Sequence, residues 1–374
     1  MKFPASVMSA LRDAEPVPPP AGLEAAGAVA PHSPEQAALL MSACAAEGLT
    51  VGFWGSGARR EVGGARPYDM GLLSSQMADV IDWQVDDLTI VVGSGMTVGT
   101  LERLLASERQ TSLLPTMDPS RTIGGLIAEG ASGYARLKYG PSRDRVLETT
   151  IVTGYGKIVR GGGRLVKNVT GYDLPRLVTG SLGSLGFITS VCLKLWPVAI
   201  TSATGRVRDA QEALERLYRP VAVLETDVGN FATFEGSVSD VRSQVLAAEA
   251  TVEGEPRWPA PITSPVMLSI RVPPRLVRDA RSGVVEAGAN RWIAQHGVGV
   301  VDAGFETLPI DRFAALRSEV EAMGGAAVVI RSGRQLEGVD PWGAVPSTFG
   351  VQTSMKALFD PAGVCNPGKL PGGL

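Results

Sequence analysis

Residues 122–133 read Thr-Ile-Gly-Gly-Leu-Ile-Ala-Glu-Gly-Ala-Ser-Gly. Thr122 and the pair Gly124-Gly125 precede a short apolar run, which predicts a hydroxyl group and backbone N–H donors at the start of a helix. The dipole at a helix N-terminus favours phosphate. Because a long stretch of small residues is costly in conformational entropy, we expect a large, flat ligand to lie against it. The alternative is a glycine-rich surface loop.

Upstream, the loop Gly55-Ser-Gly-Ala-Arg59 directly follows a strand expected at residues 49–54. Small residues let successive backbone N–H groups converge on an anion such as a pyrophosphate. Arg59 would add positive charge, although the backbone would do most of the binding. Taken by itself, the loop is equally compatible with an ordinary tight turn.

The motif Gly93-Ser-Gly-Met-Thr-Val-Gly99 stands between a predicted strand and a predicted helix. Its spacing is GxGxxxG rather than GxGxxG, and no acidic residue follows at the distance where a ribose partner is expected. The motif therefore predicts a structural strand-to-helix turn. We exclude a Rossmann-type nicotinamide site on this basis.

Downstream, residues 161–177 read GGGRLVKNVTGYDLPRL and residues 180–189 read GSLGSLGFIT. Lys167, Asn168 and Tyr172 stand among turn glycines in the first of these stretches. Such a polar set can orient a ligand, and these three residues are the catalytic candidates. A hydrogen-bonded corner without a ligand is an equal alternative.

Composition narrows the class of protein. The chain has 374 residues, of which 44% are apolar and 20% are charged, and its formal net charge is −3. These values exclude a disordered chain, and the lack of basic excess argues against a nucleic-acid binder. Glycine supplies 45 positions, of which 14 lie between residues 121 and 190. The glycine surplus is therefore concentrated in the loops described above.

The cysteines and the hydropathy pattern are those expected of a cytoplasmic protein. Cys44, Cys192 and Cys365 are far apart in the sequence and form no CxxC pair, which argues against an iron–sulfur cluster. Reduced thiols are expected. No apolar stretch approaches the roughly 18 residues of a membrane span, and the opening residues lack the apolar core of a signal peptide. We expect a cytoplasmic protein without a transmembrane segment.

Changes in composition and in the pattern of expected helices and strands along the chain predict four segments. Residues 1–24 form a proline-rich lead-in, and residues 25–200 form a domain of strand–loop–helix units. Residues 201–349 alternate helices and strands, which predicts a smaller α+β domain with an antiparallel sheet. Residues 350–374 are a short helix followed by a Gly/Pro-rich tail. The sequence reveals no internal repeat.

In this order, the glycine stretches resemble the flavin-binding half of the vanillyl-alcohol-oxidase/p-cresol-methylhydroxylase (PCMH-type) superfamily. Within it, the likeness is to the E-type FAD-binding subunits of glycolate oxidase (glycolate dehydrogenase). The likeness is continuous over about residues 25–200, weak over 201–349, and resumes near 350. The matching stretches are GSGAR at Gly55–Arg59, TIGGLIAEGASG at Thr122–Gly133, GGRLVKNVTGYDLPRL at Gly162–Leu177, GSLGSLGFIT at Gly180–Thr189 and FDPAGVCNPGKL at Phe359–Leu370.

The resemblance implies a fold and a cofactor. The fold would be α+β: a PCMH-type FAD-binding domain of two α/β subdomains, with a smaller α+β cap that has an antiparallel sheet. FAD would bind non-covalently, because no histidine follows the GSGAR loop. The implied cofactor-binding residues are Gly55, Ser56, Gly57, Ala58, Arg59, Pro115, Asp118, Thr122, Ile123, Gly124, Gly125, Ser132, Gly133, Ser142, Asp144, Gly183, Ile188, Asn366 and Lys369.

The resemblance also implies an activity and partners. The chain would be the FAD-binding subunit of a complex that oxidises a small 2-hydroxy acid, glycolate or D-lactate, to the 2-oxo acid by hydride transfer to flavin. Electrons would pass to an iron–sulfur partner subunit, and a second FAD-binding flavoprotein subunit would carry much of the substrate chemistry. Association with a membrane would be peripheral and through partners.

Histidine is scarce, and this leaves alternatives open. The chain contains only His32 and His296, so no close pair of histidines is present for a catalytic divalent metal. We expect no metal site. The alternatives are a non-catalytic flavin scaffold or electron-relay subunit, or a stand-alone FAD-linked oxidoreductase for an unknown alcohol. Substrate identity lies in the weakly matching cap.

Overall fold

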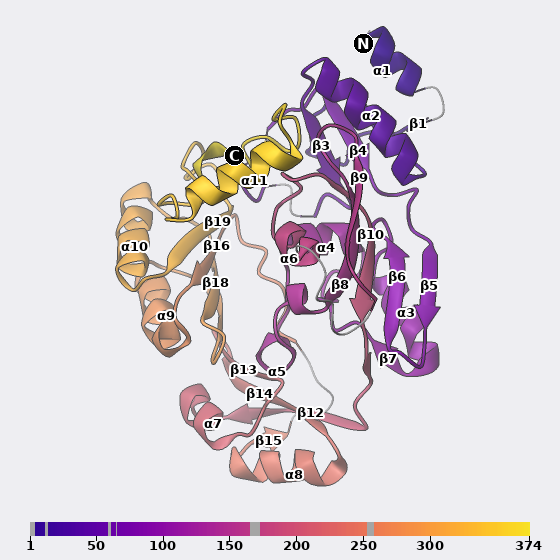
Figure 1. Ribbon diagram of the computed structural model, residues 1–374. Helices are drawn as coiled ribbons and strands as arrows, with labels where there is room; N and C mark the ends of the chain where they lie inside the picture. Colours follow the sequence, from indigo (N-terminus) through magenta and orange to yellow (C-terminus); the bar gives the residue numbers. More distant parts are fainter. Residues whose placement is uncertain (1–3, 12–13, 59–60, 65, 165–172, 253–257) are drawn as a thin grey trace.

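The computed structural model describes the chain apart from residues 1–3, 12–13, 59–60, 65, 165–172 and 253–257. The chain folds into two lobes (Figure 1). Among the described residues, the N-terminal lobe holds two larger sheets and the two-stranded β7–β11 sheet, and the other lobe holds one large antiparallel sheet. This mixed α+β architecture confirms the expected fold class. We propose that the lobes divide near residue 200, because the large sheet begins with a strand at Thr201.

The first sheet of the N-terminal lobe is small, with strand order β1-β2-β4-β3. β2, β4 and β3 run parallel, as a crossover through helix α2 requires. Ser33 caps α2 by accepting a hydrogen bond from the Gln36 N–H at 3.2 Å, and Pro34 occupies the first turn. Leu40 and Met41 bury the inner face of the helix. The bounds are α1 Ala5–Ala10, β1 Glu15–Pro16, β2 Ala28–Ala30, α2 Pro34–Ala46, β3 Val51–Trp54 and β4 Met70–Leu73.

The second sheet is antiparallel, with order β5-β6-β10-β8-β9. Its core packs under helices α3 and α4 and includes Ile90, Leu101, Leu126 and Ile151. The bounds are β5 Val80–Gln84, β6 Thr89–Gly93, α3 Val98–Leu105, β7 Gln110–Thr111, α4 Ile123–Glu129, α5 Arg136–Tyr139, β8 Val146–Val152, β9 Ile158–Gly162, α6 Leu174–Val178, β10 Phe187–Lys194 and β11 Trp196–Pro197.

The turn at Gly93–Gly99 has the structural role that its spacing predicted. A Cβ on Gly93 would overlap the Met77 carbonyl, and one on Gly95 would overlap the Ser74 carbonyl. Only glycine allows the backbones to approach this closely. The turn is therefore required for packing, and it leads directly into α3.

The second lobe consists of two successive β-α-β-β-α-β units, a repeat in topology that the sequence does not reveal. The strand order is β15-β12-β14-β13-β17-β18-β16-β19, so the two halves mirror each other about the antiparallel β13–β17 pair. The repeat is not visible in the sequence, because it is a repeat of strand and helix order and not of residue identity. The bounds are β12 Thr201–Val207, α7 Ala210–Arg216, β13 Ala222–Thr226, β14 Gly229–Gly236, α8 Val238–Ala247, β15 Thr251–Val252, β16 Val266–Arg271, α9 Val277–Glu286, β17 Arg291–Gln295, β18 Val300–Phe305, α10 Ile310–Ala322 and β19 Ala326–Arg331.

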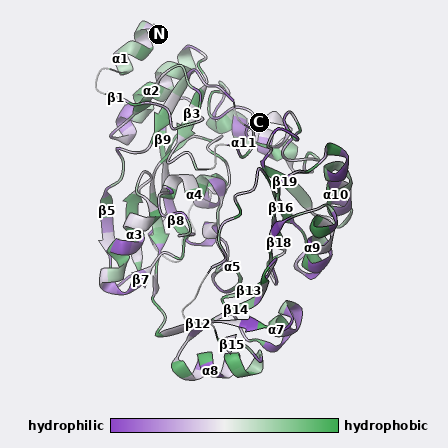
Figure 2. Cartoon of the chain, turned by 180° about the vertical axis from the view of Figure 1, so that it is seen from behind, coloured by the Kyte–Doolittle hydropathy of each residue, from purple (hydrophilic) through white to green (hydrophobic). Residues whose placement is uncertain are grey.

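Helices cover one face of this sheet. α9 and α10 carry both hydrophobic and hydrophilic residues (Figure 2), as amphipathic helices do. Their apolar faces bury Val284, Leu316 and Val320 against Ile270 and Val301 of the sheet. Among the described helices, none is both long and apolar enough to cross a bilayer.

A polar network occupies the junction of the two repeats. The Glu225 carboxylate of β13 lies 2.9 Å from Nε2 of the fully buried His296 and 3.1 Å from the Arg281 guanidinium of α9. The hydrogen bond to His296, with a further contribution from Arg281, keeps the pKa of Glu225 below its ordinary value. Glu225 therefore holds the two halves of the second lobe together in its ionised form.

We expect Glu225→Gln to lower the free energy of unfolding at pH 7 by about 1–3 kcal/mol, because the buried His296 and the half-buried Arg281 lose a half-buried charged partner. A lowered carboxyl pKa stabilises the fold above the ordinary value of about 4.3, and this contribution is lost as the pH falls. Urea unfolding at pH 7, 5 and 3.5 should therefore show a flatter acid limb for the variant. Glu212→Gln, which removes an exposed partner of Arg216, is the control. An unchanged acid limb in Glu225→Gln would contradict the assignment.

The tail returns from the second lobe to the first. After helix α11 (Phe349–Phe359), the chain bridges in parallel to β3, where Cys365 pairs with Val51. The Val51 N–H donates to the Val364 carbonyl at 2.8 Å, and the Asn366 N–H donates to the Val51 carbonyl at 2.9 Å. Residues more than 300 positions apart in the sequence are therefore joined at one wall of the N-terminal lobe.

Candidate cofactor site

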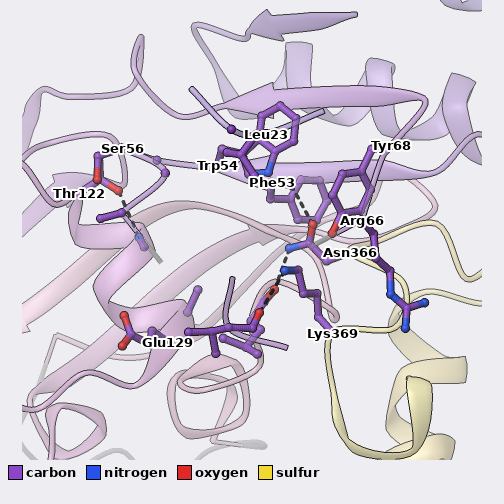
Figure 3. Close-up of a pocket in the computed structure, with 18 of the residues that line it drawn as sticks. Leu23, Phe53, Trp54, Ser56, Arg66, Tyr68, Thr122, Glu129, Asn366 and Lys369 are labelled. Atoms are coloured by element: carbon purple, nitrogen blue, oxygen red, sulfur yellow. Dashed lines mark hydrogen bonds between the residues drawn. The ribbon is translucent and has the colours of Figure 1, made fainter. Parts of the chain in front are cut away.

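A cavity of about 260 Å³ lies in the N-terminal lobe, between the loop after β3, helix α4 and the tail (Figure 3). A smaller cavity of about 60 Å³ adjoins it. The two share part of their lining, and together they are called the cleft. The shared residues are Phe53, Trp54, Gly55, Gly125, Ala128, Leu182 and Asn366.

The loop after β3 presents free backbone donors to the larger cavity. Gly57 has φ +71°, a left-handed conformation that turns successive N–H groups to one side. Within the described part of the chain, the N–H groups of Ser56, Gly57 and Ala58 find no hydrogen-bond acceptor. Such a nest of unpaired N–H groups is suited to an anion, as the sequence predicted for this loop.

Helix α4 meets this loop at very close range. Thr122 caps the helix by accepting a hydrogen bond from the Gly125 N–H at 3.3 Å. A Cβ on Gly55 would overlap the Thr122 hydroxyl oxygen. Glycine at position 55 therefore allows the loop at residues 55–58 and Thr122, the N-cap of α4, to lie side by side in one wall of the cavity (Figure 3).

The N-terminus of α4 differs from the prediction. The Ile123 N–H donates to the Met96 carbonyl and the Gly124 N–H donates to the Ser94 carbonyl, both at 2.8 Å. Because these donors already have protein acceptors, they are not available to a phosphate. The loop at residues 55–58 provides the available backbone donors instead.

Asn366 joins three walls of the cleft. Its side-chain oxygen accepts a hydrogen bond from the Phe53 N–H at 2.9 Å, and its side-chain nitrogen donates to the Leu182 carbonyl at 2.7 Å. Asn366 and Leu182 both have positive φ, at 38° and 51°. Strained backbone of this kind persists where the surrounding structure enforces it, which is common at binding sites.

Lys369 brings a positive charge to the same cavity. Its ammonium group donates hydrogen bonds to the Val62 and Gly64 carbonyls. Burial, with a smaller effect of Arg66, lowers the pKa of Lys369 to about 8. The side chain is therefore mostly protonated at neutral pH, and an anion in the cavity would favour its charged form.

Two buried hydroxyl groups on the lining have no partner among the described residues: Tyr68 OH and Ser94 Oγ. Burial raises the pKa of Tyr68 to about 12, so this phenol remains a neutral donor. Unsatisfied buried polar atoms are rare in native proteins. Together with the nest and Lys369, they fit a ligand that carries phosphates and polar ring atoms, as FAD does.

We expect Tyr68→Phe to leave the free energy of unfolding of the FAD-free protein within about 0.5 kcal/mol of wild type, because no hydrogen bond is lost. FAD affinity should fall about 5–10-fold if the phenol donates to the cofactor, as one neutral hydrogen bond allows. Fluorescence titration with FAD and urea unfolding measure the two quantities. Tyr155→Phe, at an exposed hairpin, should change neither. An unchanged FAD affinity in Tyr68→Phe would leave its hydroxyl without a role in the site.

The structure brings most of the expected cofactor residues together. The larger cavity is lined by Gly55, Ser56, Gly57, Ala58, Thr122, Gly125, Asn366 and Lys369, and the smaller by Gly124, Gly183 and Ile188. Arg59, Lys167, Asn168 and Tyr172 lie outside the described residues.

The remaining candidates do not line either cavity. Ile123 is fully buried in the core of the second sheet. Asp118 accepts hydrogen bonds from Ser120 in a local turn. The others lie in the segments that lead up to α4 and away from it: Pro115, Ser132, Gly133, Ser142 and Asp144. Their place in the cofactor site stays a prediction.

Sequence reasoning missed several lining residues. Trp54 and Tyr68 pack edge to face, with ring centroids 6.0 Å apart, and form one end of the larger cavity. Leu182 lies within the GSLGSLGFIT stretch but carries no polar group to mark it. A signal existed for Trp54, which directly precedes the glycine loop. No pattern marked Tyr68, because strand pairing alone brings it to the cavity.

Comparison with known proteins identifies this lobe. Residues 25–162 match the family described as FAD binding domain. Residues 25–162 are an FAD binding domain. The match places the nest, α4 and Tyr68 within this domain, and FAD is its cofactor.

Curated relatives match the FAD binding domain and its surroundings. Glycolate oxidase subunit GlcD of Bacillus subtilis strain 168 is 36% identical over 182 residues, which are 47% of this chain and 38% of the relative. Glycolate oxidase subunit GlcE of Escherichia coli K12 is 40% identical over 122 residues, 32% and 34% of the two chains. D-lactate dehydrogenase of Archaeoglobus fulgidus is 30% identical over 198 residues, 52% and 44%. The matches span less than half the length of these relatives.

A solved structure extends the likeness beyond the FAD binding domain. Alkyldihydroxyacetonephosphate synthase superposes with a TM-score of 0.63 and 17% identity, covering 91% of this chain and 75% of the other. At this identity the likeness concerns the fold. It includes the second lobe, where the sequence resemblance is weak.

Proposed function

We propose that the chain is an FAD-dependent oxidoreductase: the FAD-binding subunit of a glycolate-oxidase-type complex that oxidises a small 2-hydroxy acid, glycolate or D-lactate, to the 2-oxo acid. The observation that carries the proposal is the cleft whose nest of free N–H groups, unpartnered hydroxyls and Lys369 fit FAD. Relatives named for glycolate oxidase subunits and D-lactate dehydrogenase support the substrate class.

Different residues of the chain would bind the cofactor and orient the substrate. The N–H groups of residues 56–58 bind the cofactor phosphates, and Lys369 balances their charge. FAD, when bound, supplies the acceptor for a hydride from the substrate α-carbon. We propose that Lys167, Asn168 and Tyr172, together with the second lobe as a cap, orient the substrate.

Partners are part of the proposal. All three cysteines are buried and unpaired, and among the described residues no three His, Cys, Asp or Glu side chains are grouped as metal ligands. An iron–sulfur partner subunit would therefore accept the electrons, and a second flavoprotein subunit would complete the complex. We propose a cytoplasmic location, with any membrane association made through partners.

One observation favours an alternative, a flavin scaffold or electron-relay subunit without its own substrate. Neither histidine lines the cleft: His32 is exposed at the start of α2, and His296 is buried against Glu225 in the cap. The general base that most often assists proton removal is therefore absent from the described lining. In this alternative the second flavoprotein subunit carries the substrate chemistry.

Native purification followed by flavin and iron counts tests the proposal. We expect about one FAD per chain, with an iron–sulfur protein co-purifying. A flavin-free protein without partners would overturn both readings. Anaerobic mixing of the isolated FAD-loaded chain with glycolate and with D-lactate then separates them: bleaching of the oxidised flavin band supports intrinsic oxidation, and persistent colour supports the relay.

A further inference from the structure

A buried ion pair lies beneath the tail, outside the cleft. The Lys356 ammonium of α11 is 2.6 Å from the Asp360 carboxylate, and their side chains are only 10% and 0% exposed. Neither residue lines either cavity. Burying two charges is costly unless every remaining donor and acceptor is satisfied, so the partners of this pair show what it holds.

The Lys356 ammonium connects the tail to the wall of the cleft. Besides Asp360, it donates to the Ser184 carbonyl at 2.8 Å and to the Cys365 carbonyl at 2.8 Å. Ser184 lies between Gly183 and Gly186, which line the smaller cavity. All three ammonium hydrogens are therefore satisfied, and two of them join the tail to this loop.

The Asp360 carboxylate shapes the turn that leads into the tail. One oxygen accepts the Val364 N–H at 3.0 Å, and the other accepts the Cys365 N–H at 2.8 Å. Its position is restricted from the other side by Gly154, where a Cβ would overlap the carboxylate. The residue after Cys365 is Asn366, and Lys369 lies three positions beyond Asn366. The pair thus sets the starting point of the segment that reaches the cavity.

We propose that the Lys356–Asp360 pair is a positioning element for the cofactor: it holds Asn366 and Lys369 in the cleft and thereby sets FAD affinity without contacting FAD. The inference rests on the FAD site proposed above. Because the pair acts through the tail, its effect on FAD affinity requires Asn366 and Lys369. A pair that merely stabilised the fold would act whether or not these side chains were present.

Lys356→Met tests the proposal by FAD titration of the full chain. We expect the dissociation constant to rise about 30-fold, equivalent to the loss of one charge-assisted hydrogen bond. In the background Asn366→Ala/Lys369→Met, the same substitution should change it less than about threefold, because coupled residues are not additive. Equal factors in both backgrounds would overturn the proposal, as would wild-type affinity in Lys356→Met.

Hydrogen exchange provides a readout that is independent of FAD. In FAD-free Lys356→Met, the amides of Phe53, Val364, Cys365 and Asn366 should lose protection, while amides of β16 and β18 keep theirs. Protection lost equally in both regions would indicate a general structural role and contradict the proposal. If wild type binds no FAD, the proposed function fails while the exchange pattern still decides whether the pair positions the tail.

Two further variants complete the design. Asp360→Asn keeps the side-chain shape while removing the charge, and we expect a smaller effect of the same kind; it decides the outcome if Lys356→Met does not fold. Lys138→Met is the matched control, since Lys138 pairs with Glu235 at 3.0 Å and bonds to the Glu235 carbonyl at 3.3 Å, away from the tail. Lys138→Met should leave FAD affinity within about threefold of wild type. A loss of FAD affinity of about 30-fold in Lys138→Met would show that the effect of Lys356→Met is not specific to the tail.

Discussion

Gly55→Ala is expected to weaken FAD binding by about 100-fold, the effect of displacing binding groups by roughly 1 Å. The added Cβ would overlap the hydroxyl oxygen of Thr122 and crowd its Cβ and methyl carbon. Either Thr122 leaves its capping position on α4, or the loop at residues 55–58 moves away from the cavity. The free energy of unfolding should fall by about 1–3 kcal/mol, as overpacked sites do. FAD titration and urea unfolding measure the two effects.

A compensating substitution makes this prediction specific. Thr122→Ala removes the hydroxyl oxygen and the methyl carbon and keeps the Cβ, so Gly55→Ala/Thr122→Ala should recover part of the FAD affinity lost in Gly55→Ala. Gly350→Ala in α11, where a Cβ would meet nothing within 4 Å, is the matched control and should bind FAD as wild type does. Wild-type FAD binding in Gly55→Ala would show that the close contact with Thr122 does not shape the phosphate loop.

FAD affinity is expected to fall as the pH rises through about 8, where Lys369 loses its proton in the FAD-free protein. A phosphate near the ammonium raises the pKa of the bound form, so binding takes up a proton above pH 8. The dissociation constant should then rise by up to about tenfold per pH unit until the pKa of the bound form is reached. Titrations between pH 7 and 9.5 measure this slope.

The contribution of Lys369 to the stability of the FAD-free protein should have the opposite slope. A lowered lysine pKa means that the folded state binds the proton less readily than the unfolded chain, whose lysine pKa is about 10.4. Stability is therefore fully present above pH 10.4 and is lost as the pH falls toward 8. Lys369→Met should abolish the pH slope of FAD affinity, remove this contribution to stability and weaken FAD binding at pH 7.

In the folded protein, burial raises the pKa of Cys44 and Cys192 to about 11 and that of Tyr68 to about 12, so these groups do not titrate near pH 8. In the unfolded chain a cysteine titrates at about pH 8.5, so the cysteines lower the stability as the pH rises, and the contribution of Lys369 is the difference between the stability profiles of wild type and Lys369→Met. Lys157→Met, at an exposed hairpin position, should retain both slopes and serves as the control. A pH slope of FAD affinity that persists in Lys369→Met would show that another group titrates and that Lys369 does not face the phosphates.

Local chemistry explains why much of the site was predictable. A nest of N–H groups needs consecutive small residues and a left-handed glycine, so the GSGAR motif indicated a nest at residues 55–58, with an ordinary tight turn as an equal alternative. The same reasoning is wrong for α4, because the acceptors that occupy the N–H groups of Ile123 and Gly124 are the Met96 and Ser94 carbonyls. Their proximity depends on how a separate turn packs against the helix.

The cap shows the same limit. Helices and strands were recognisable from residue 201 onward, yet the twofold repeat was not, because topology depends on which strands pair rather than on which residues fill them. The Glu225–His296–Arg281 network forms only because β13 and β17 meet at the centre of the sheet. No spacing along the chain brings these three side chains together.

Short stretches of sequence were therefore enough to predict the glycine loops, their order and the FAD-type fold. Close backbone approach and positive φ require particular residues at particular positions. Tertiary structure alone decided which backbone N–H groups of the cleft remain without an acceptor among the described residues, and that Tyr68 reaches the cavity. It also placed the Lys356 ammonium between the Asp360 carboxylate, the Ser184 carbonyl and the Cys365 carbonyl of the tail. These outcomes depend on contacts between segments that are separate in the sequence, from 27 residues for Ile123 and Met96 to 172 for Lys356 and Ser184, where the energy of burial and of hydrogen bonding is determined by the assembled fold.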